Sequence, residues 1–221
     1  MLTIPRRGLV LDLPLNWDAK DYSWNWHDGT PTDVAWVETN IGYQSKCASF
    51  NGSSSYVVSP LQLYNSSFTI SMFVKKNTWT TKMYFYSSKA TYRSDYRHLW
   101  LYIDWGNWLF IYRSYMINWT WSSWGAAIKK IDISKWYHIV CQFDWSNLKV
   151  FVNWNLSYIE PISKYNLNNI VLWYSNIHND YYFNWSIILF RIHNRVLTEP
   201  EIRTLYLEWL RKLTSARNTY L

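Results

Sequence analysis

Apolar and polar residues alternate with a period of two along most of this chain. The clearest runs are segments 67–75, 139–143 and 148–153, which are separated from their neighbours by turn residues such as Asp, Asn and Ser. A period of two places every second side chain on the same face of an extended strand. Shorter or less regular strand-like runs occupy residues 8–15, 34–37, 47–58, 82–87, 99–104, 109–114, 128–133, 170–174 and 186–192.

About a dozen short strands with turn signals between them predict an all-β fold, an antiparallel β-sandwich or barrel, rather than alternating strands and helices. The polar segment 16–31 is expected to be a loop. The segment 116–125, which is rich in Ser, Thr and Trp, is expected to be a second loop.

The C-terminal segment has a helical period instead. Thr198 is the expected N-cap, Pro200 lies in the first turn, and Glu201 follows the cap by three residues, which is the spacing of a capping box. Apolar residues then recur at helical spacing, at Ile202, Leu205, Tyr206, Leu210 and Leu213. We therefore predict one amphipathic helix, over about residues 199–215, that closes the sandwich. Docking of a partner is an alternative use of its apolar face.

Tryptophan occupies turn positions where glycine is usual. Asn153-Trp154 separates two strand-like runs, and a two-residue hairpin turn of type I′ needs positive φ at both central residues, for which Asn-Gly is the strongest signal. The same pairing recurs at residues 16–17, 25–26, 107–108, 118–119 and 184–185. The chain has 17 Trp and only 6 Gly, where an ordinary chain of this length would hold roughly 15 Gly.

This pattern suggests that most of these tryptophans are glycines in the native protein. The codon UGA is read as Trp in some genetic codes and as Gly in others, so reading the gene under the wrong code would produce it. Trp36 and Trp136 lie in strand-like runs and are expected to be genuine, and Trp79 and Trp100 are undecided. The rival interpretation is an aromatic surface that stacks on sugars or bases. In that case Trp119, Trp121 and Trp124 form the leading glycan-binding site.

Composition narrows the possible partners. The net charge is +7, but Lys and Arg are scattered and form no long basic run, so a solvated basic surface is favoured over a nucleic-acid site. Cys47 and Cys141 lie in apolar runs and are expected to be buried thiols, with a single disulfide as the alternative. No apolar run reaches the length of a membrane span, and the N-terminal apolar stretch is too short for a good signal peptide.

Five motifs in this order resemble the laminin-G-like, concanavalin-A-like jelly-roll family, whose members read "sFNG", "fTiS.WvK", "WhHva..yDG..lklYvNG" and "G.iddvRiyNRaLs..Ei..ly". The motifs are Ser49–Gly52 (SFNG), Phe68–Lys75 (FTISMFVK), Lys135–Val140 (KWYHIV), Asp144–Trp154 (DWSNLKVFVNW) and Phe190–Thr198 (FRIHNRVLT). At Trp145, Trp154 and Trp185 the family pattern has Gly, whereas Trp136 matches the family's own Trp. The resemblance implies a single jelly-roll domain over residues 1–221, with its core at about 8–196.

The chain lacks the catalytic pattern of related glycoside hydrolases, which place carboxylates on one face of a strand in an E-x-D-x-x-E run. No such run occurs among the glutamates Glu38, Glu160, Glu199, Glu201 and Glu208, and the histidines have no metal-ligand spacing. His138 is expected to be a strand residue rather than a catalytic base. The sequence therefore predicts a protein that is not an enzyme.

Two loops are rich in the oxygen ligands that Ca²⁺ prefers. They contain Asp18, Asp21 and Asp28, and Asn176, Asn179 and Asp180. Relatives often carry one Ca²⁺ at the rim of the sandwich, although Asp and Asn also cap turns without any metal.

The expected function is a non-catalytic module that recognises a glycan or another surface ligand within an extracellular, surface or phage-like structural protein. A protein-binding adhesion domain is the first alternative, and a hydrolase with an unrecognised site is the second.

Overall fold

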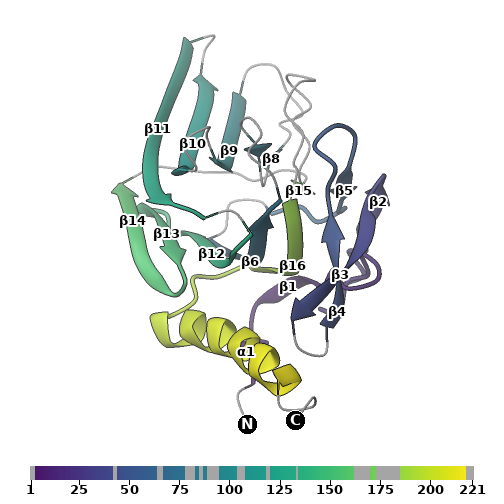
Figure 1. Cartoon of the computed structure of the whole chain (residues 1–221). Coiled ribbons are helices and arrows are strands. Elements are labelled where there is room, and N and C mark those ends of the chain that lie inside the picture. The colour runs from purple at the N-terminus through teal and green to yellow at the C-terminus, as the bar shows by residue number, and fades with distance from the viewer. Residues whose placement is uncertain are drawn as a thin grey trace.

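The computed structural model describes residues 3–41, 44–63, 67–77, 83–84, 87–88, 95–103, 108–117, 120–132, 134–161, 170–172 and 185–217. The elements in these ranges are β1 (Leu9–Leu13), β2 (Thr30–Thr32), β3 (Ala35–Ile41), β4 (Gln44–Ser49), β5 (Tyr56–Val58), β6 (Phe68–Lys76), β7 (Met83–Tyr84), β8 (Ser87–Ser88), β9 (Asp95–Ile103), β10 (Trp108–Ile117), β11 (Thr120–Lys130), β12 (Trp136–Phe143), β13 (Asn147–Val152), β14 (Asn155–Pro161), β15 (Ile170–Leu172), β16 (Trp185–His193) and α1 (Glu199–Arg217). Within them, all-β architecture with one C-terminal helix is confirmed (Figure 1).

A main antiparallel sheet has the order β14-β13-β12-β6-β16-β4-β3, and β1 also pairs with β16. The strands predicted from alternation form its centre, where Ile139 of β12 lies opposite Met72 of β6, and Val74 of β6 lies opposite Ile187 of β16. These side chains join one large apolar cluster with residues of β1 and β4. The alternating pattern predicted these central strands because one face of each carries a continuous apolar row.

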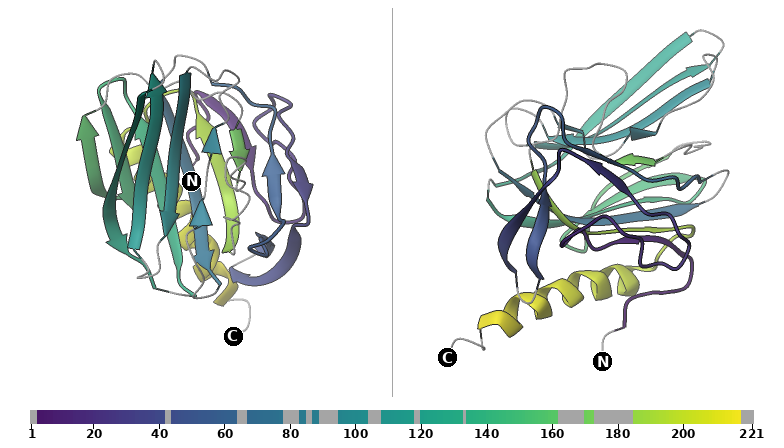
Figure 2. Two further views of the ribbon diagram at one scale, coloured as in Figure 1. Left: turned by 90° about the horizontal axis from the view of Figure 1, so that it is seen from above. Right: turned by 90° about the vertical axis from the view of Figure 1, so that its right-hand side faces the viewer.

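The second layer consists of two smaller sheets, with orders β11-β10-β9-β7 and β2-β5-β15-β8. Figure 2 shows β9, β10 and β11 on the side of the main sheet opposite α1, with the far ends of these strands splayed away from it. The described architecture is a jelly-roll β-sandwich.

The prediction of a loop over residues 116–125 was wrong. Residues 120–125 belong to β11, and Thr120 through Ala127 pair without a break with Ile117 through Phe110 of β10. Thr and Trp are residues that favour strands, so a segment that resembles a loop in its Ser and Thr content forms a long hairpin here.

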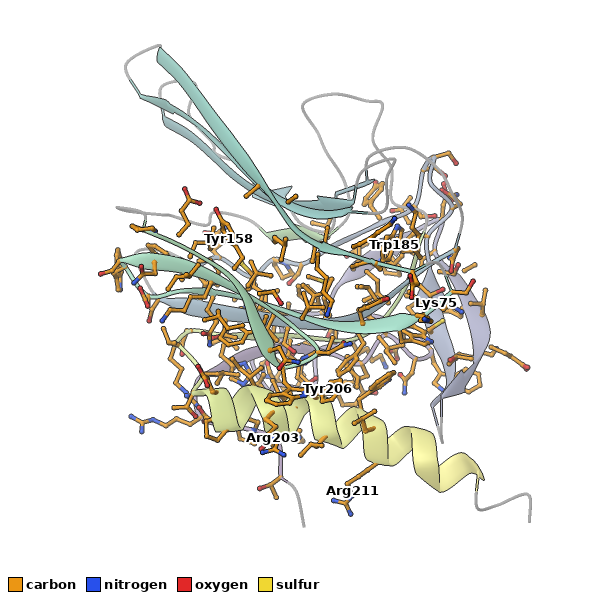
Figure 3. All side chains as sticks on the ribbon, turned by 60° about the vertical axis from the view of Figure 1, so that its left-hand side comes forward. Lys75, Tyr158, Trp185, Arg203, Tyr206 and Arg211 are labelled. Carbon is orange, nitrogen blue, oxygen red and sulfur yellow. The ribbon has the colours of Figure 1, made fainter. Side chains whose placement is uncertain are left out.

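The helix α1 covers the outer face of the main sheet, which is why the central strands are buried on both faces (Figure 2). Val140 and Phe151 from the sheet pack against Ile202 and Leu205 from the helix. Tyr206 points from the helix toward the sheet, whereas Arg211 points away from it (Figure 3). The predicted use of the helix in core packing is confirmed.

The predicted capping residues begin this helix. The Thr198 backbone N–H and hydroxyl both donate to Glu201 Oε2, at 2.8 Å and 3.1 Å. Arg195 Nη1 donates to the same carboxylate at 2.9 Å, and these contacts lower the pKa of Glu201 to about 2. The carboxylate therefore stays charged at the positive end of the helix dipole.

Candidate functional site

The segment 14–29 between β1 and β2, here called the N-terminal loop, is built around the buried carboxylate of Asp21. Its Oδ1 accepts hydrogen bonds from the backbone N–H groups of Asp12 and Ser23, both at 2.9 Å. Its Oδ2 accepts from the Ser23 hydroxyl at 2.8 Å and from the His27 N–H at 3.0 Å. A buried carboxylate with four donors fixes the loop, because leaving any of these groups without a partner costs free energy.

Further hydrogen bonds tie the N-terminal loop to β1 and close its base. The Tyr22 N–H donates to the Asp12 carbonyl at 2.8 Å, and Gly29 N–H donates to the Ala19 carbonyl at 2.7 Å. His27 Nδ1 lies 3.1 Å from the Val10 carbonyl oxygen. The loop is therefore a folded element with a defined outer surface rather than a loose connection.

Aromatic rings stand out from this loop into solvent. Tyr22 is 52% exposed, and Trp24 and Trp26 are 84% and 85% exposed. Arg6 Nη1 donates to the Tyr22 carbonyl at 3.4 Å, and Lys20 of the same loop is also exposed. We call these five residues the loop face. Flat rings with a polar edge and nearby cations can contact the apolar face and the hydroxyls of a sugar.

The loop face was not predicted as a binding site, although the alternation of Tyr, Trp and Asp over residues 21–28 signals it. The sequence instead favoured Trp119, Trp121 and Trp124. Trp119 lies outside the described residues, and positions 121 and 124 belong to β11, where they pair with Met116 and Arg113 of β10. The two candidate regions lie on different elements.

The three aspartates proposed for calcium all belong to the N-terminal loop but serve as turn acceptors. Asp28 Oδ1 accepts from the Asp21 N–H at 2.8 Å, and Asp18 Oδ1 accepts from the Lys20 N–H at 3.1 Å. Within the part of the chain that the structure describes, no three metal-ligating acids, histidines or cysteines gather at one point. The second predicted group, Asn176, Asn179 and Asp180, lies outside the described residues.

A serine and a histidine meet inside the protein without forming a usable catalytic pair. Ser71 Oγ lies 2.8 Å from His138 Nε2, but both residues are buried and Phe73 stacks on the imidazole at 4.4 Å. Burial lowers the pKa of His138 to about 3, and its Nδ1 has no partner among the described residues. A general base needs access to substrate, a pKa near the working pH and an orienting partner. His138 is therefore a buried residue of strand β12, and the prediction that it lies in a strand is confirmed.

The described glutamates do not form a glycosidase pair. Glu38 is on β3 and Glu160 is on β14, two strands at opposite ends of the main sheet, and the other three are on α1. Retaining and inverting glycosidases need two carboxyl groups that face one another across the scissile bond. The described glutamates therefore do not supply such a pair.

Residues 51–203 match the family model described as the concanavalin A-like lectin/glucanases superfamily. No curated protein is similar enough in sequence to count as a relative. In the described part of the chain, no helix is both long and apolar enough to span a membrane.

Several solved structures share the fold. Domain 4 of an extracellular GH43 arabinanase, AbnA, from Geobacillus stearothermophilus, in complex with arabinotriose, is 20% identical with a TM-score of 0.67, and the match covers 90% of this chain and 98% of that domain. The binding domain of botulinum neurotoxin DC, in complex with rat synaptotagmin II, is 16% identical with a TM-score of 0.70. Botulinum neurotoxin type C, which depends on interaction with two ganglioside molecules to enter cells, is 14% identical with a TM-score of 0.65.

The matches cover 93% and 91% of this chain but only 52% and 51% of the two toxin chains, so the chain spans about half of their length. At this level of identity these solved structures show only that the fold is shared.

Proposed function

Because this chain belongs to the concanavalin A-like lectin/glucanase superfamily, we propose that it is a non-catalytic module that binds a glycan within an extracellular or cell-surface protein. The observation that carries the proposal is the match to domain 4 of the arabinanase. The structure of that domain was solved in complex with arabinotriose, and the match covers 98% of it. The two folds therefore correspond over nearly a whole sugar-bound domain rather than over part of a larger catalytic unit.

The surface of the described residues supports this proposal. The loop face is a rigid aromatic and cationic surface on the N-terminal loop, and flat rings of this kind contact sugars with little loss of side-chain entropy. Trp119, Trp121 and Trp124 remain a second proposed glycan surface.

Protein recognition is the second candidate function. The toxin binding domain that shares this fold was solved in complex with rat synaptotagmin II, so the same architecture also serves a protein partner there. A loop with exposed Tyr and Trp beside Arg has the composition of a protein-binding hot spot. The two functions therefore predict the same surface and differ in the ligand.

A glycan array probed with the purified, folded chain separates them. The glycan proposal predicts saturable binding to one class of glycan, and a panel of β-glucans and arabinans should remain uncleaved. Binding should weaken in Tyr22→Ala, whereas Tyr206→Ala, which changes a ring between the helix and the sheet, should retain it if the variant folds. Capture of a surface protein with no glycan binding favours the second candidate. Release of reducing ends by the chain would contradict a non-catalytic role.

A further inference from the structure

Four of the tryptophans that the structure describes have a left-handed backbone conformation. The φ angles are +71° at Trp24, +60° at Trp26, +71° at Trp145 and +65° at Trp154. For a side chain with a Cβ this region is strained, and the strain is greater for bulky residues than for Asn or Asp. Glycine adopts the same region without a steric penalty.

Burial does not compensate this strain. Trp24 and Trp26 are almost fully exposed, and Trp145 and Trp154 are 43% and 40% exposed. Among the described residues, the other non-glycine positions with positive φ are either small and polar, as at Asp33, Ser134 and Asn153, or packed in the core, as at Leu15 and Leu189. The four tryptophans therefore combine a bulky residue type with exposed positions that offer no burial in return.

The hairpin turns show what each position requires. Asn153 has φ +50° and Trp154 has φ +65°, so both central residues of the turn between β13 and β14 are left-handed. This is the geometry for which Asn-Gly is the preferred sequence. In the turn between β12 and β13, the carboxylate of Asp144 accepts from the N–H groups of Ser146 and Asn147, at 3.0 Å and 2.6 Å. Trp145 lies between Asp144 and Ser146 in the chain, where the backbone must reverse direction.

Strain at one binding site is the alternative explanation, because functional sites do store backbone strain. The four positions do not form one site. Trp24 and Trp26 are on the N-terminal loop, Trp145 contacts Phe143 at one end of β13, and Trp154 lies beside Arg203 of α1 at the other end. The shared property is the backbone conformation rather than the location.

Other tryptophans have the opposite character. Trp185 and Trp209 are buried and do not have positive φ. The Lys75 ammonium lies over the ring of Trp136, 5.4 Å from its centroid. Trp185 differs from the family pattern, which has Gly, but here its side chain fills the core. A left-handed backbone therefore distinguishes some of the described tryptophans from the others.

We propose that glycine occupies positions 24, 26, 145 and 154 of the native protein, because its source organism reads the UGA codon at these positions as glycine. This proposal does not require that the chain binds a glycan. It has a consequence for the site, because Tyr22 would then be the aromatic residue of the loop face and recognition would depend on it and on polar groups.

The direct experiment reads the four codons in the gene and measures peptide masses of the protein isolated from its source. UGA codons and glycine-containing peptides at all four positions are the expected result. UGG codons or tryptophan-containing peptides at these positions would overturn the proposal.

A stability measurement tests the same proposal on recombinant chains. The quadruple variant Trp24→Gly, Trp26→Gly, Trp145→Gly and Trp154→Gly should unfold at a higher urea concentration than the all-tryptophan chain. Trp17→Gly is the matched control, because Trp17 also follows an asparagine and is 57% exposed but does not have positive φ. The control should not raise the midpoint. An unchanged or lower midpoint for the quadruple variant would contradict the proposal. If the all-tryptophan chain fails to fold, folding of the quadruple variant alone supports it, and failure of both opposes it.

Discussion

Replacing Arg191 with Met should be among the most destabilising single changes in this protein. Arg191 is buried on β16 and joins β1 to α1, because Nε donates to Asp12 Oδ1 at 2.9 Å and Nη1 donates to Glu208 Oε2 at 2.8 Å. The attraction of these two carboxylates outweighs burial and raises the pKa of Arg191. The guanidinium therefore remains charged and clamps the helix to the sheet.

The expected magnitude follows from what the change leaves behind. Asp12 would keep a buried carboxylate whose nearest remaining cation is the exposed Arg6, at 3.7 Å from Oδ2, and Glu208 would lose its cation from the sheet. Removing one partner of a buried ion pair costs about 3–5 kcal/mol. A typical domain has a margin of about 5–15 kcal/mol, so the loss should be a large fraction of the total stability.

Equilibrium unfolding in urea, followed by far-UV circular dichroism, measures this loss. With a urea dependence of about 2 kcal/mol/M, the midpoint should fall by about 2 M. The double variant Asp12→Asn, Arg191→Met should recover part of the loss, because it removes one unpaired charge. Lys135→Met is the control, since its pair with Asp132 is fully exposed, and the midpoint should not change measurably. A loss below about 1 kcal/mol in Arg191→Met, at unchanged urea dependence, would refute the clamp.

Three further predictions concern pH, the helix start and metal. Burial lowers the pKa of His138 to about 3 and of His193 to about 4, so below about pH 6.5 the unfolded chain binds protons that the folded chain does not. The free energy of unfolding should therefore fall by up to about 1.4 kcal/mol per pH unit for each histidine as the pH drops from 6.5 toward 4. Urea titrations at several pH values should show a weaker pH dependence of this free energy in His138→Gln than in the parent chain; an equal pH dependence would count against this account. Thr198→Ala should lower stability by about 0.5–2 kcal/mol through loss of the cap, while Thr204→Ala, which changes a hydroxyl inside the helix, should cost less. Excess Ca²⁺ should leave the melting temperature unchanged relative to a chelator, because the described loop aspartates accept hydrogen bonds from the backbone and do not gather at one point; a higher melting temperature with Ca²⁺ would show that the ion binds.

The strands that could be predicted from sequence are those with a continuous apolar face. The alternation in β6, β12 and β13 follows from their position in the centre of the main sheet, between the second layer and the helix. The prediction failed at β11, because composition alone does not distinguish a Ser- and Trp-rich loop from a strand whose partner is β10. Whether such a segment forms a strand depends on its partner strand, and only the tertiary fold determines that partner.

Contacts between residues far apart in the sequence could not be predicted, for the same reason. The contact of Arg191 with Asp12 joins residues 179 positions apart, and no local pattern signals it. Turn chemistry is local, by contrast, and the expectation that tryptophans in turns require positive φ is confirmed at Trp145 and Trp154. It does not extend to Trp185, whose place in the core depends on tertiary packing.

The most direct test of the proposed function is a calorimetric titration of the folded quadruple-glycine chain with the glycan class selected by the array, with arabinotriose included as one ligand. Chromatography of the sugar after the titration shows whether it has been cleaved. The proposal predicts saturable binding that weakens in Tyr22→Ala and leaves the glycan intact. Absence of binding to any glycan by a cooperatively folded chain, or cleavage of the ligand, would contradict it.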